Sequence, residues 1–284
     1  MHAYIKGSAW LSPSGFKTLT NRDQAASSPF ITEESIQNIH LPKLPRVPDV
    51  AKACCAVVSQ VLLEAGLTVP FAVRSEESER TALVVGNNDS SVRPIEALQS
   101  EAEIYGPNRV SPAIFPNTVY NALAGYIAIH VNIKGTNTTL SGATSTVPAA
   151  LLYGLRLLAK GRHDRVVVCH VHLLPSAKKA TRQDEEEGSF PPDEERITAL
   201  LLERPGVGTH GKYALDWELT KANGLYTALS PDVTPRMDVE LIKLIQEERL
   251  AEQEVMLGRF QNGDLLKLRF NNGDVDGLKE AHSR

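Results

Sequence analysis

Cysteine is scarce in this chain: there are three among 284 residues, two of them adjacent at Cys54 and Cys55. Domains held together by disulfides carry several spaced pairs of cysteines, so this pattern excludes a disulfide framework. We expect Cys54 and Cys55 to be buried apolar side chains, since neighbouring residues on a helix point in different directions. A reducing, cytoplasmic setting is therefore the expected one.

Long hydrophobic runs and an excess of positive charge are also absent. The longest apolar stretches, such as VPAALLYGLRLLA, are interrupted well before the roughly 18 residues that a membrane span requires. The first residues, MHAYIKGSAW, show no basic segment followed by an apolar one, so no secretory signal is expected. A net charge of −4 favours neither nucleic-acid nor anionic-membrane binding.

The chain is rich enough in apolar residues for a sizeable core, with 42% hydrophobic and 23% charged residues. Apolar spacing predicts alternating helices and short buried strands, which is typical of a layered α/β domain. The first expected helix has Asp49 as its N-cap and stops at Gly66. Three further helices are expected at 94–104, 121–131 and 147–159. The expected strands lie near 4–9 and at 81–88, 138–140, 165–173 and 197–205.

The C-terminal part has a different character. Residues 176–195 are rich in acidic side chains and predict a solvated loop. The segment HGKYALDWELT is expected to be the antiparallel neighbour of strand 197–205, and DLLKLRFNNGDV predicts a strand that turns at Asn272-Gly273. The segment Asp238–Leu257 predicts a charged amphipathic helix. This helix is either a solvated face, or it docks on a partner or covers an exposed sheet edge. The apolar residues available for such a contact are Leu241, Ile242, Ile245 and Leu250.

The dipeptide Ala143-Thr144 stands at a predicted strand-to-helix turn, within the densest pattern of the chain. This stretch resembles the N-terminal half of the β-ketoacyl synthases, in which an apolar strand delivers Ala-Cys to the start of a helix. The match runs from about Pro48 to Pro205. Its elements keep the family's order: LLEAGL, LVVG, SPAIFPNTVYNALAGYIA, the turn at Gly135, the Ala143-Thr144 turn and VVVCHVH.

The resemblance implies a thiolase-like layered αβαβα fold, usually assembled as a dimer, with the second half truncated. Fewer than 80 residues follow Pro205, whereas a complete second half would need about 150 to 200. We therefore expect a ketosynthase-like core at 1–175, the acidic loop at 176–195, strands resembling the start of the second half at 196–235, and a helix and short strand at 236–284.

Two departures from the family pattern concern the chemistry. Thr144 replaces the nucleophilic cysteine, and an unactivated hydroxyl is nearly inert where a thiolate would react. The two catalytic histidines of the family's second half are also missing. In addition, the run Cys169-His170-Val171-His172 replaces the paired glycines that usually close the strand after the nucleophile helix. Without cysteine and histidines, neither acyl transfer nor decarboxylation has its expected groups.

The resemblance thus implies a catalytically silent subunit, similar to the chain length factors of type II polyketide and aryl-polyene systems. Its expected partner is a complete ketosynthase, with an acyl carrier protein as a further candidate, and no cofactor or metal is expected. Such a subunit should expose apolar surface when isolated, because the family's dimer strand needs a mate. The residues expected to face partner or acyl chain are Phe115, Asn117, Thr118, Asn121, Thr138, Leu140 and Thr144.

Other interpretations stay open from the sequence alone. Thr144 can serve as a helix N-cap, or Thr144, Ser141 or Ser145 can act as the nucleophile of a small acyltransferase or thioester hydrolase. The chain can also be a homodimeric acyl-binding protein. His170 and His172 lie two apart on one strand face and could hold a metal with a third ligand, but no third ligand is evident.

Overall fold

The computed structural model describes residues 2–12, 15–18, 47–142, 146–174, 195–208, 213–220, 241, 254–259 and 264–272. Its nine described strands form one mixed sheet in the order β4-β3-β5-β6-β1-β7-β9-β8, with β2 paired to β1 beside this path. The strands are β1 His2–Ser12, β2 Gly15–Thr18, β3 Thr81–Asn88, β4 Asn137–Leu140, β5 Arg165–His172, β6 Arg196–Glu203, β7 Tyr213–Thr220, β8 Glu254–Arg259 and β9 Leu265–Asn272.

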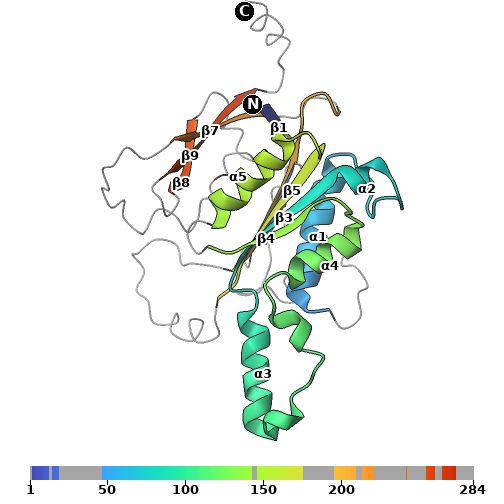
Figure 1. Ribbon diagram of the computed structural model, residues 1–284, viewed down its shortest axis with the longest axis vertical. Coiled ribbons are helices and arrows are strands. Elements are labelled where there is room, and N and C mark those ends of the chain that lie inside the picture. The colour runs from blue at the N-terminus through green and yellow to red at the C-terminus, as the bar shows by residue number, and fades with distance from the viewer. Residues whose placement is uncertain are drawn as a thin grey trace, which may run out of the picture.

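Helices cover the sheet on both faces. The α-helices are α1 Asp49–Glu64, α2 Glu76–Arg80, α3 Val92–Tyr105, α4 Ala122–Val131 and α5 Thr146–Ala159, and two 3₁₀ turns are η2 Pro107–Arg109 and η3 Phe115–Thr118. Helices α1 and α4 lie on one side of the strands β3, β4 and β5, whereas α5 lies on the other side (Figure 1). Helix α3 projects away from the body of the molecule (Figure 1).

The strand side chains alternate between two cores, as the period of two in a β-strand requires. Val85, Val167 and Cys169 pack with α1 and α4, whereas Val84 and Val168 pack with α5. Strand β5 is buried along almost its whole length and lies between β3 and β6, which confirms the prediction of a central, helix-covered strand.

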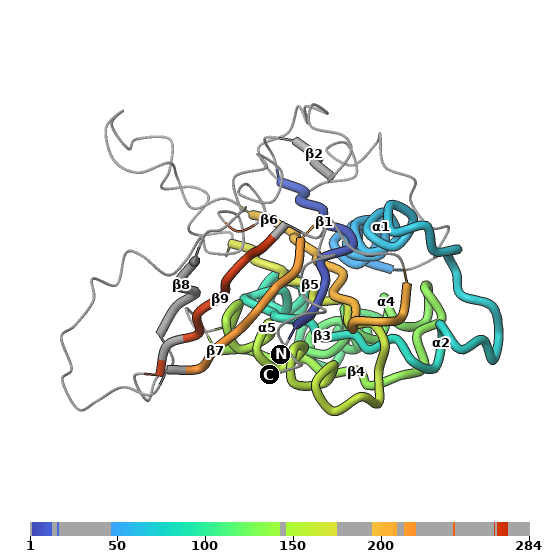
Figure 2. The backbone as a smooth tube through the Cα atoms, turned by 90° about the horizontal axis from the view of Figure 1, so that it is seen from above, coloured from blue at the N-terminus to red at the C-terminus, as the bar shows by residue number. Residues whose placement is uncertain are grey.

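The sheet curves around α5, so that strands β7, β8 and β9 lie on the side of α5 opposite to β3 and β5 (Figures 1 and 2). Residues Leu215 of β7 and Leu268 of β9 share one core cluster with Leu151 and Leu155 of α5. The molecule is therefore layered. Helices α1 and α4 form the first layer, strands β3, β4 and β5 the second, α5 the third, and strands β7, β8 and β9 the fourth. The predicted layered α/β fold is confirmed.

Helix α1 shows how local chemistry sets its ends. Asp49 is the first helical residue and Pro48 occupies the N-cap position, so the prediction of Asp49 as the N-cap was wrong by one residue. Gly66 ends the helix as predicted: its φ of +77° is a left-handed conformation that glycine adopts without strain. There the Gly66 N–H donates to Leu63 O and the Leu67 N–H donates to Leu62 O, which closes the last turn.

The N-terminal strand changes one predicted pairing. Strand β1 lies between β6 and β7, pairing antiparallel with both, so β7 is not the direct neighbour of β6. The segment HGKYALDWELT does form an antiparallel strand, but its partners are β1 and β9. Partner choice is decided by which edge is open in the assembled sheet, and the alternation of side chains carries no information about that.

The predicted C-terminal helix is also corrected. Residues 254–257 of the expected helix belong to β8, which pairs antiparallel with β9 from Glu254↔Arg269 onwards. Leu241 is helical and its side chain is buried in the core that contains α5 and Leu200, so it is neither solvated nor free to dock on a partner. Ile242, Ile245 and Leu250 lie outside the described residues, as does Gly273 of the predicted turn.

Candidate functional site

The carboxyl ends of three parallel strands meet at one edge of the sheet. Strand β3 pairs in parallel with β4 on one side and with β5 on the other, and helix α5 begins at Thr146, six residues after β4 ends. In open α/β sheets, ligands bind outside the carboxyl ends of the strands. This edge, together with the first turns of α5, is therefore the candidate functional site.

A directional chain of hydrogen bonds crosses the site. The backbone N–H of Gly142 donates to Thr146 Oγ1 over 2.9 Å, and the Thr146 hydroxyl donates to Asn88 Oδ1 over 2.7 Å. Asn88 Nδ2 then lies 3.4 Å from His170 Nε2. An amide nitrogen can only donate, so this arrangement assigns the acceptor role to His170 Nε2 and the ring proton to Nδ1.

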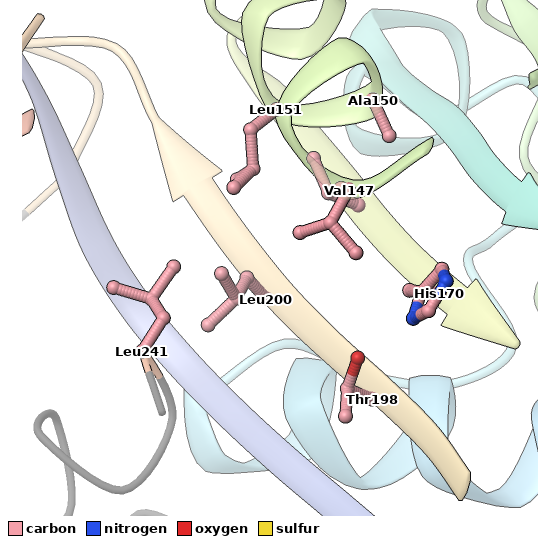
Figure 3. A pocket seen from close by; sticks show the side chains of 8 residues that line it. Val147, Ala150, Leu151, His170, Thr198, Leu200 and Leu241 are labelled. Atoms are coloured by element: carbon pink, nitrogen blue, oxygen red, sulfur yellow. The ribbon is translucent and has the colours of Figure 1, made fainter. Parts of the chain in front are cut away.

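A small pocket lies beside this chain, between the first turns of α5 and strands β5 and β6 (Figure 3). His170 and Thr198, which are register partners on β5 and β6, supply its polar groups. The unfilled space is about 20 Å³, which is room for a single water-sized group. The remaining lining side chains are all apolar: Val147, Ala150, Leu151, Val168, Leu200 and Leu241.

The residues predicted from the sequence fall into three groups. Thr138 and Leu140 lie on β4, the last strand of the sheet path. Phe115, Asn117, Thr118 and Asn121 lie together in a separate excursion after β3. Thr144, like Ser145, lies outside the described residues, so its role as nucleophile or N-cap stays a prediction.

The excursion, residues 89–121, is named the arm here; it comprises α3, η2 and η3 (Figure 1). Hydrogen bonds hold its turns: Ser111 N–H donates to the Glu101 carboxylate (2.7 Å) and the Thr118 hydroxyl donates to Phe115 O (2.8 Å). The Tyr126 hydroxyl of α4 donates to Asn117 Oδ1 (2.9 Å). The polar residues of the FPNT turn thus satisfy local groups, whereas the Phe115 ring is 65% exposed.

The arm carries an unusual amount of exposed apolar surface. None of the 14 residues of α3, all of which the structure describes, is buried. Ten large apolar side chains are exposed in the described part of the chain, and six of them belong to the arm: Ile95, Ile104, Tyr105, Phe115, Val119 and Tyr120. Exposed apolar side chains are therefore more frequent in the arm than in the rest of the described chain.

A buried ion pair that the sequence did not predict ties the arm to the sheet. Glu195 is 1% exposed, although it ends the segment predicted as a solvated acidic loop; that prediction is wrong at this residue, and 176–194 lie outside the described residues. Its carboxylate accepts from Arg93 of α3 and from the backbone N–H of Leu174 (3.1 Å). A buried carboxylate persists only with such partners.

A second charged cluster stabilises the opposite end of the sheet. Asp164, just before β5, accepts from Arg80 Nε (2.5 Å) and Nη2 (2.8 Å) and from Arg204 Nη2 (2.6 Å). The hydrogen bonds from Arg80 lower the pKa of Asp164 to about 2. Burial, with the charges of Arg80 and Arg162, lowers the pKa of the neighbouring His163. These groups stabilise the start of β5, whereas the candidate site lies at the carboxyl end of this strand.

The metal interpretation gains no support. Among the described residues, no three His, Cys, Asp or Glu side chains are grouped so that they could hold an ion. His170 and His172 share a strand, and the Asn88 amide lies against His170 Nε2. The described helices include none that is both long and apolar enough to cross a bilayer.

The three cysteines converge in the core between α1 and the sheet. Cys54, Cys55 and Cys169 are free and buried, which confirms the prediction of buried apolar side chains for the first two. Burial, followed by a hydrogen bond with Cys169, raises the pKa of Cys54. Burial and the neighbouring Cys169 raise the pKa of Cys55 to about 12. Neutral thiols of this kind are poor nucleophiles.

Asn88, Thr146 and Thr198 were not predicted from the sequence as site residues, whereas His170 was considered as a metal ligand and as part of the run that replaces the family's paired glycines. Asn88, Thr146, His170 and Thr198 come from four different elements, and only the folded sheet brings them together. The pair Asn87-Asn88, directly after an apolar strand, is a signal that could have been used: polar residues at the carboxyl end of a buried strand are well placed for a site.

Comparisons with known proteins agree on the family. The sequence matches the family model of the β-ketoacyl synthase N-terminal domain over residues 13–199. It is 28% identical over 176 residues to 3-oxoacyl-[acyl-carrier-protein] synthase 2 of Vibrio cholerae, covering 58% of this chain and 41% of that protein. The same protein of Vibrio harveyi is also 28% identical over 176 residues, with 40% of its length covered. This chain thus spans about two fifths of the length of the curated relatives that it matches.

The fold is similar to that of solved ketosynthase structures. The ishigamide ketosynthase/chain length factor matches with a TM-score of 0.66 and 15% identity, covering 96% of this chain and 99% of that chain. A ketosynthase in complex with its chain length factor from Xenorhabdus doucetiae matches with a TM-score of 0.59 and 13% identity, covering 95% and 99%. A β-ketoacyl synthase from Burkholderia phymatum matches with a TM-score of 0.62, 13% identity and the same coverage.

Proposed function

Because this chain belongs to the β-ketoacyl synthase family, we propose that it is a catalytically silent subunit that pairs with a complete ketosynthase in fatty-acid-like or polyketide synthesis. In this role it stabilises the partner or shapes the partner's acyl tunnel. An acyl carrier protein would deliver the substrate to the partner ketosynthase.

The observation that carries the proposal is the arm. A 14-residue helix is marginal in water unless it packs an apolar face against something. In α3, however, no residue is buried, and the arm exposes six large apolar side chains. A second protein surface would bury them. The chain's structural neighbours include a ketosynthase bound to its chain length factor, which supports a ketosynthase as the partner.

The edge strand β4 supports the same proposal. Its outer edge has no neighbouring strand among the described residues. It also lacks the lysine, proline or bulge with which proteins usually protect a free edge. Thr139 Oγ1 is buried and has no hydrogen-bond partner among the described groups. A strand from a partner would complete the hydrogen bonds of this edge, and the site residues Thr138 and Leu140 would then lie beside the interface.

Two features support catalytic silence. Thr144 stands where the family has its cysteine, and a hydroxyl needs a positioned base to react. The pocket at the start of α5 leaves only about 20 Å³ unfilled, which is room for a single water-sized group and not for an acyl chain. We expect no covalent adduct when the protein meets an acyl-thioester probe. A mass shift that disappears in Thr144→Val would instead show an enzyme that uses this hydroxyl.

The decisive experiment uses the complete ketosynthase encoded nearest to this chain, with carrier-protein-bound substrates and product length read by mass spectrometry. We expect activity or product length to depend on this chain, and the two proteins to co-purify. Phe115→Asp and Tyr120→Asp should weaken the complex by about tenfold or more, because each places a charge in an apolar interface.

Val73→Asp is the matched control, since Val73 is 83% exposed and lies outside the arm. It should leave the complex unchanged. If the two proteins do not co-purify and the ketosynthase's activity and product length do not depend on this chain, or if all three aspartate variants behave alike, the proposed pairing through the arm is wrong.

A further inference from the structure

We infer that the imidazole of His170 is the group that closes the pocket at the start of α5, and that it thereby determines whether an acyl chain can enter this space. The inference deepens the proposed function, on which its relevance to product length rests. The closure itself is a property of this chain alone and can be tested without a partner.

The ring is packed tightly among the elements that form the site. His170 is 4% exposed. A Cβ placed on Gly86 of β3 would lie 3.0 Å from Thr146 Cγ2 and 3.2 Å from His170 Cδ2, both closer than ordinary van der Waals contact. The start of α5 and the imidazole therefore rest directly on the backbone of β3, with no slack between them.

The hydrogen-bond chain holds the ring in this place. Asn88 Nδ2 donates to His170 Nε2, and the Asn88 amide is oriented in turn by the Thr146 hydroxyl. A side chain anchored in this way does not leave the pocket without breaking a buried network, which is costly. His170 thus acts as an internal occupant at the place where a ligand would be expected.

The chemistry of the surrounding side chains indicates what the opened space would accept. Apart from His170 and Thr198, the lining is aliphatic: Val147 projects from α5, and Leu200 of β6 lies next to Leu241 (Figure 3). Removal of the imidazole would merge its volume with the existing space. Apolar cavities of this kind bind small apolar ligands, so the opened pocket should take the end of an unbranched acyl chain.

The test compares hexanoate binding by the wild-type protein and by His170→Gly, measured by calorimetry on the full chain. We expect His170→Gly to bind hexanoate at least about tenfold more tightly than the wild type. We also expect 4-methylimidazole, which has the shape of the missing side chain, to compete with hexanoate and to raise the melting temperature of the variant alone. His170→Phe, which refills the space with an apolar ring, should not bind hexanoate.

His163→Gly removes another buried histidine, remote from the pocket, and is the matched control: it should not gain hexanoate binding. If His170→Gly does not fold, His170→Gln keeps an acceptor for Asn88 with a slimmer side chain and should show weaker, but measurable, hexanoate binding. The inference is overturned if a folded His170 variant binds hexanoate no better than the wild type, or if 4-methylimidazole does not compete.

These outcomes are independent of the partner. Hexanoate binding by His170→Gly without co-purification of a ketosynthase would support the closure and contradict the proposed pairing. If the pairing holds, His170→Gly in the complex should lengthen the product. An unchanged product length, with hexanoate binding gained, would show that the opened pocket does not communicate with the partner's tunnel and would overturn the functional half of the inference.

Discussion

Asn87 closes the base of the arm by donating from its side-chain amide to the carbonyl of Tyr120, 33 residues further along the chain, over 2.8 Å. The same side chain accepts from the backbone N–H of Ser90 (3.2 Å) where the arm leaves β3. One fully buried amide therefore joins the outgoing and returning ends of the arm.

Asn87→Ala should loosen the arm. The variant leaves the Tyr120 carbonyl and the Ser90 N–H without this partner, which typically costs about 1 to 3 kcal/mol. We expect faster hydrogen exchange across 89–121 with little change in β3 and β5. Asn121→Ala, which removes an exposed side chain with no capping hydrogen bond, is the control and should exchange like the wild type. Equal exchange in all three proteins would contradict this role of Asn87.

Asp164→Asn should change how stability depends on pH. The pKa of Asp164 is lowered from its ordinary 3.8 to about 2 in the folded protein, so its stabilising contribution is fully present above the unfolded pKa. It is lost as the pH falls from about 4 towards 2, and linkage gives it a size of about 2 kcal/mol. Urea unfolding of both proteins between these pH values should show a difference that shrinks with acid. A constant difference would mean that Asp164 acts through packing alone.

Glu195→Gln should destabilise the junction between the arm and the sheet. The change places an amide N–H₂ group against Arg93 and leaves this half-buried guanidinium poorly paired; breaking a fully buried pair costs about 3 to 5 kcal/mol, and we expect a loss below that range. Arg93→Gln and the double variant complete a double-mutant cycle by urea unfolding. We expect the double variant to lose much less than the sum of the single changes. Simple additivity would mean that the two charges do not interact in solution.

The cysteines should be unreactive in the folded protein. Burial raises the pKa of Cys54 and Cys55, and the neutral thiols are closed off from solvent in the core. Ellman's reagent should label the native protein very slowly and should label all three thiols in guanidinium chloride. Rapid labelling of even one thiol in the native protein would mean that α1 separates readily from β5.

Periodicity identified most of the elements that position the site. The apolar run at Arg165–His172 predicted a strand covered on both faces, and β5 is such a strand. The apolar spacing of 147–159 predicted α5, and Gly66 predicted the end of α1. These features are local: side-chain spacing and turn residues act within a few positions of the chain.

Strand partners could not be predicted in the same way. The placement of β1 between β6 and β7 joins residues about 200 positions apart. The alternation of buried and exposed side chains along β1 does not indicate which strands it pairs with. Residues 254–257 continue a pattern of leucine and glutamate that favours a helix, yet pairing with β9 gives them strand conformation. Here tertiary contacts override local propensity.

In the candidate site too, local features could be predicted from the sequence and contacts between distant elements could not. The resemblance to the β-ketoacyl synthases located the FPNT turn, β4 and the start of α5, and it drew attention to Thr144 and to the His170-containing run. It did not reveal that the imidazole of His170 fills the pocket, that Asn88 orients it, or that Glu195 is buried against Arg93. Each of these contacts joins side chains from distant elements.

The sequence by itself determined the family and most of the helices and strands between α1 and β6, because these are properties of residue identity and local spacing; that Thr144 takes the place of the usual nucleophile stays a prediction. Only the tertiary structure decided which side chains meet at the carboxyl ends of the strands and that the arm leaves its apolar residues exposed. Those outcomes depend on how separate elements pack, and packing is decided by shape and burial across the whole molecule.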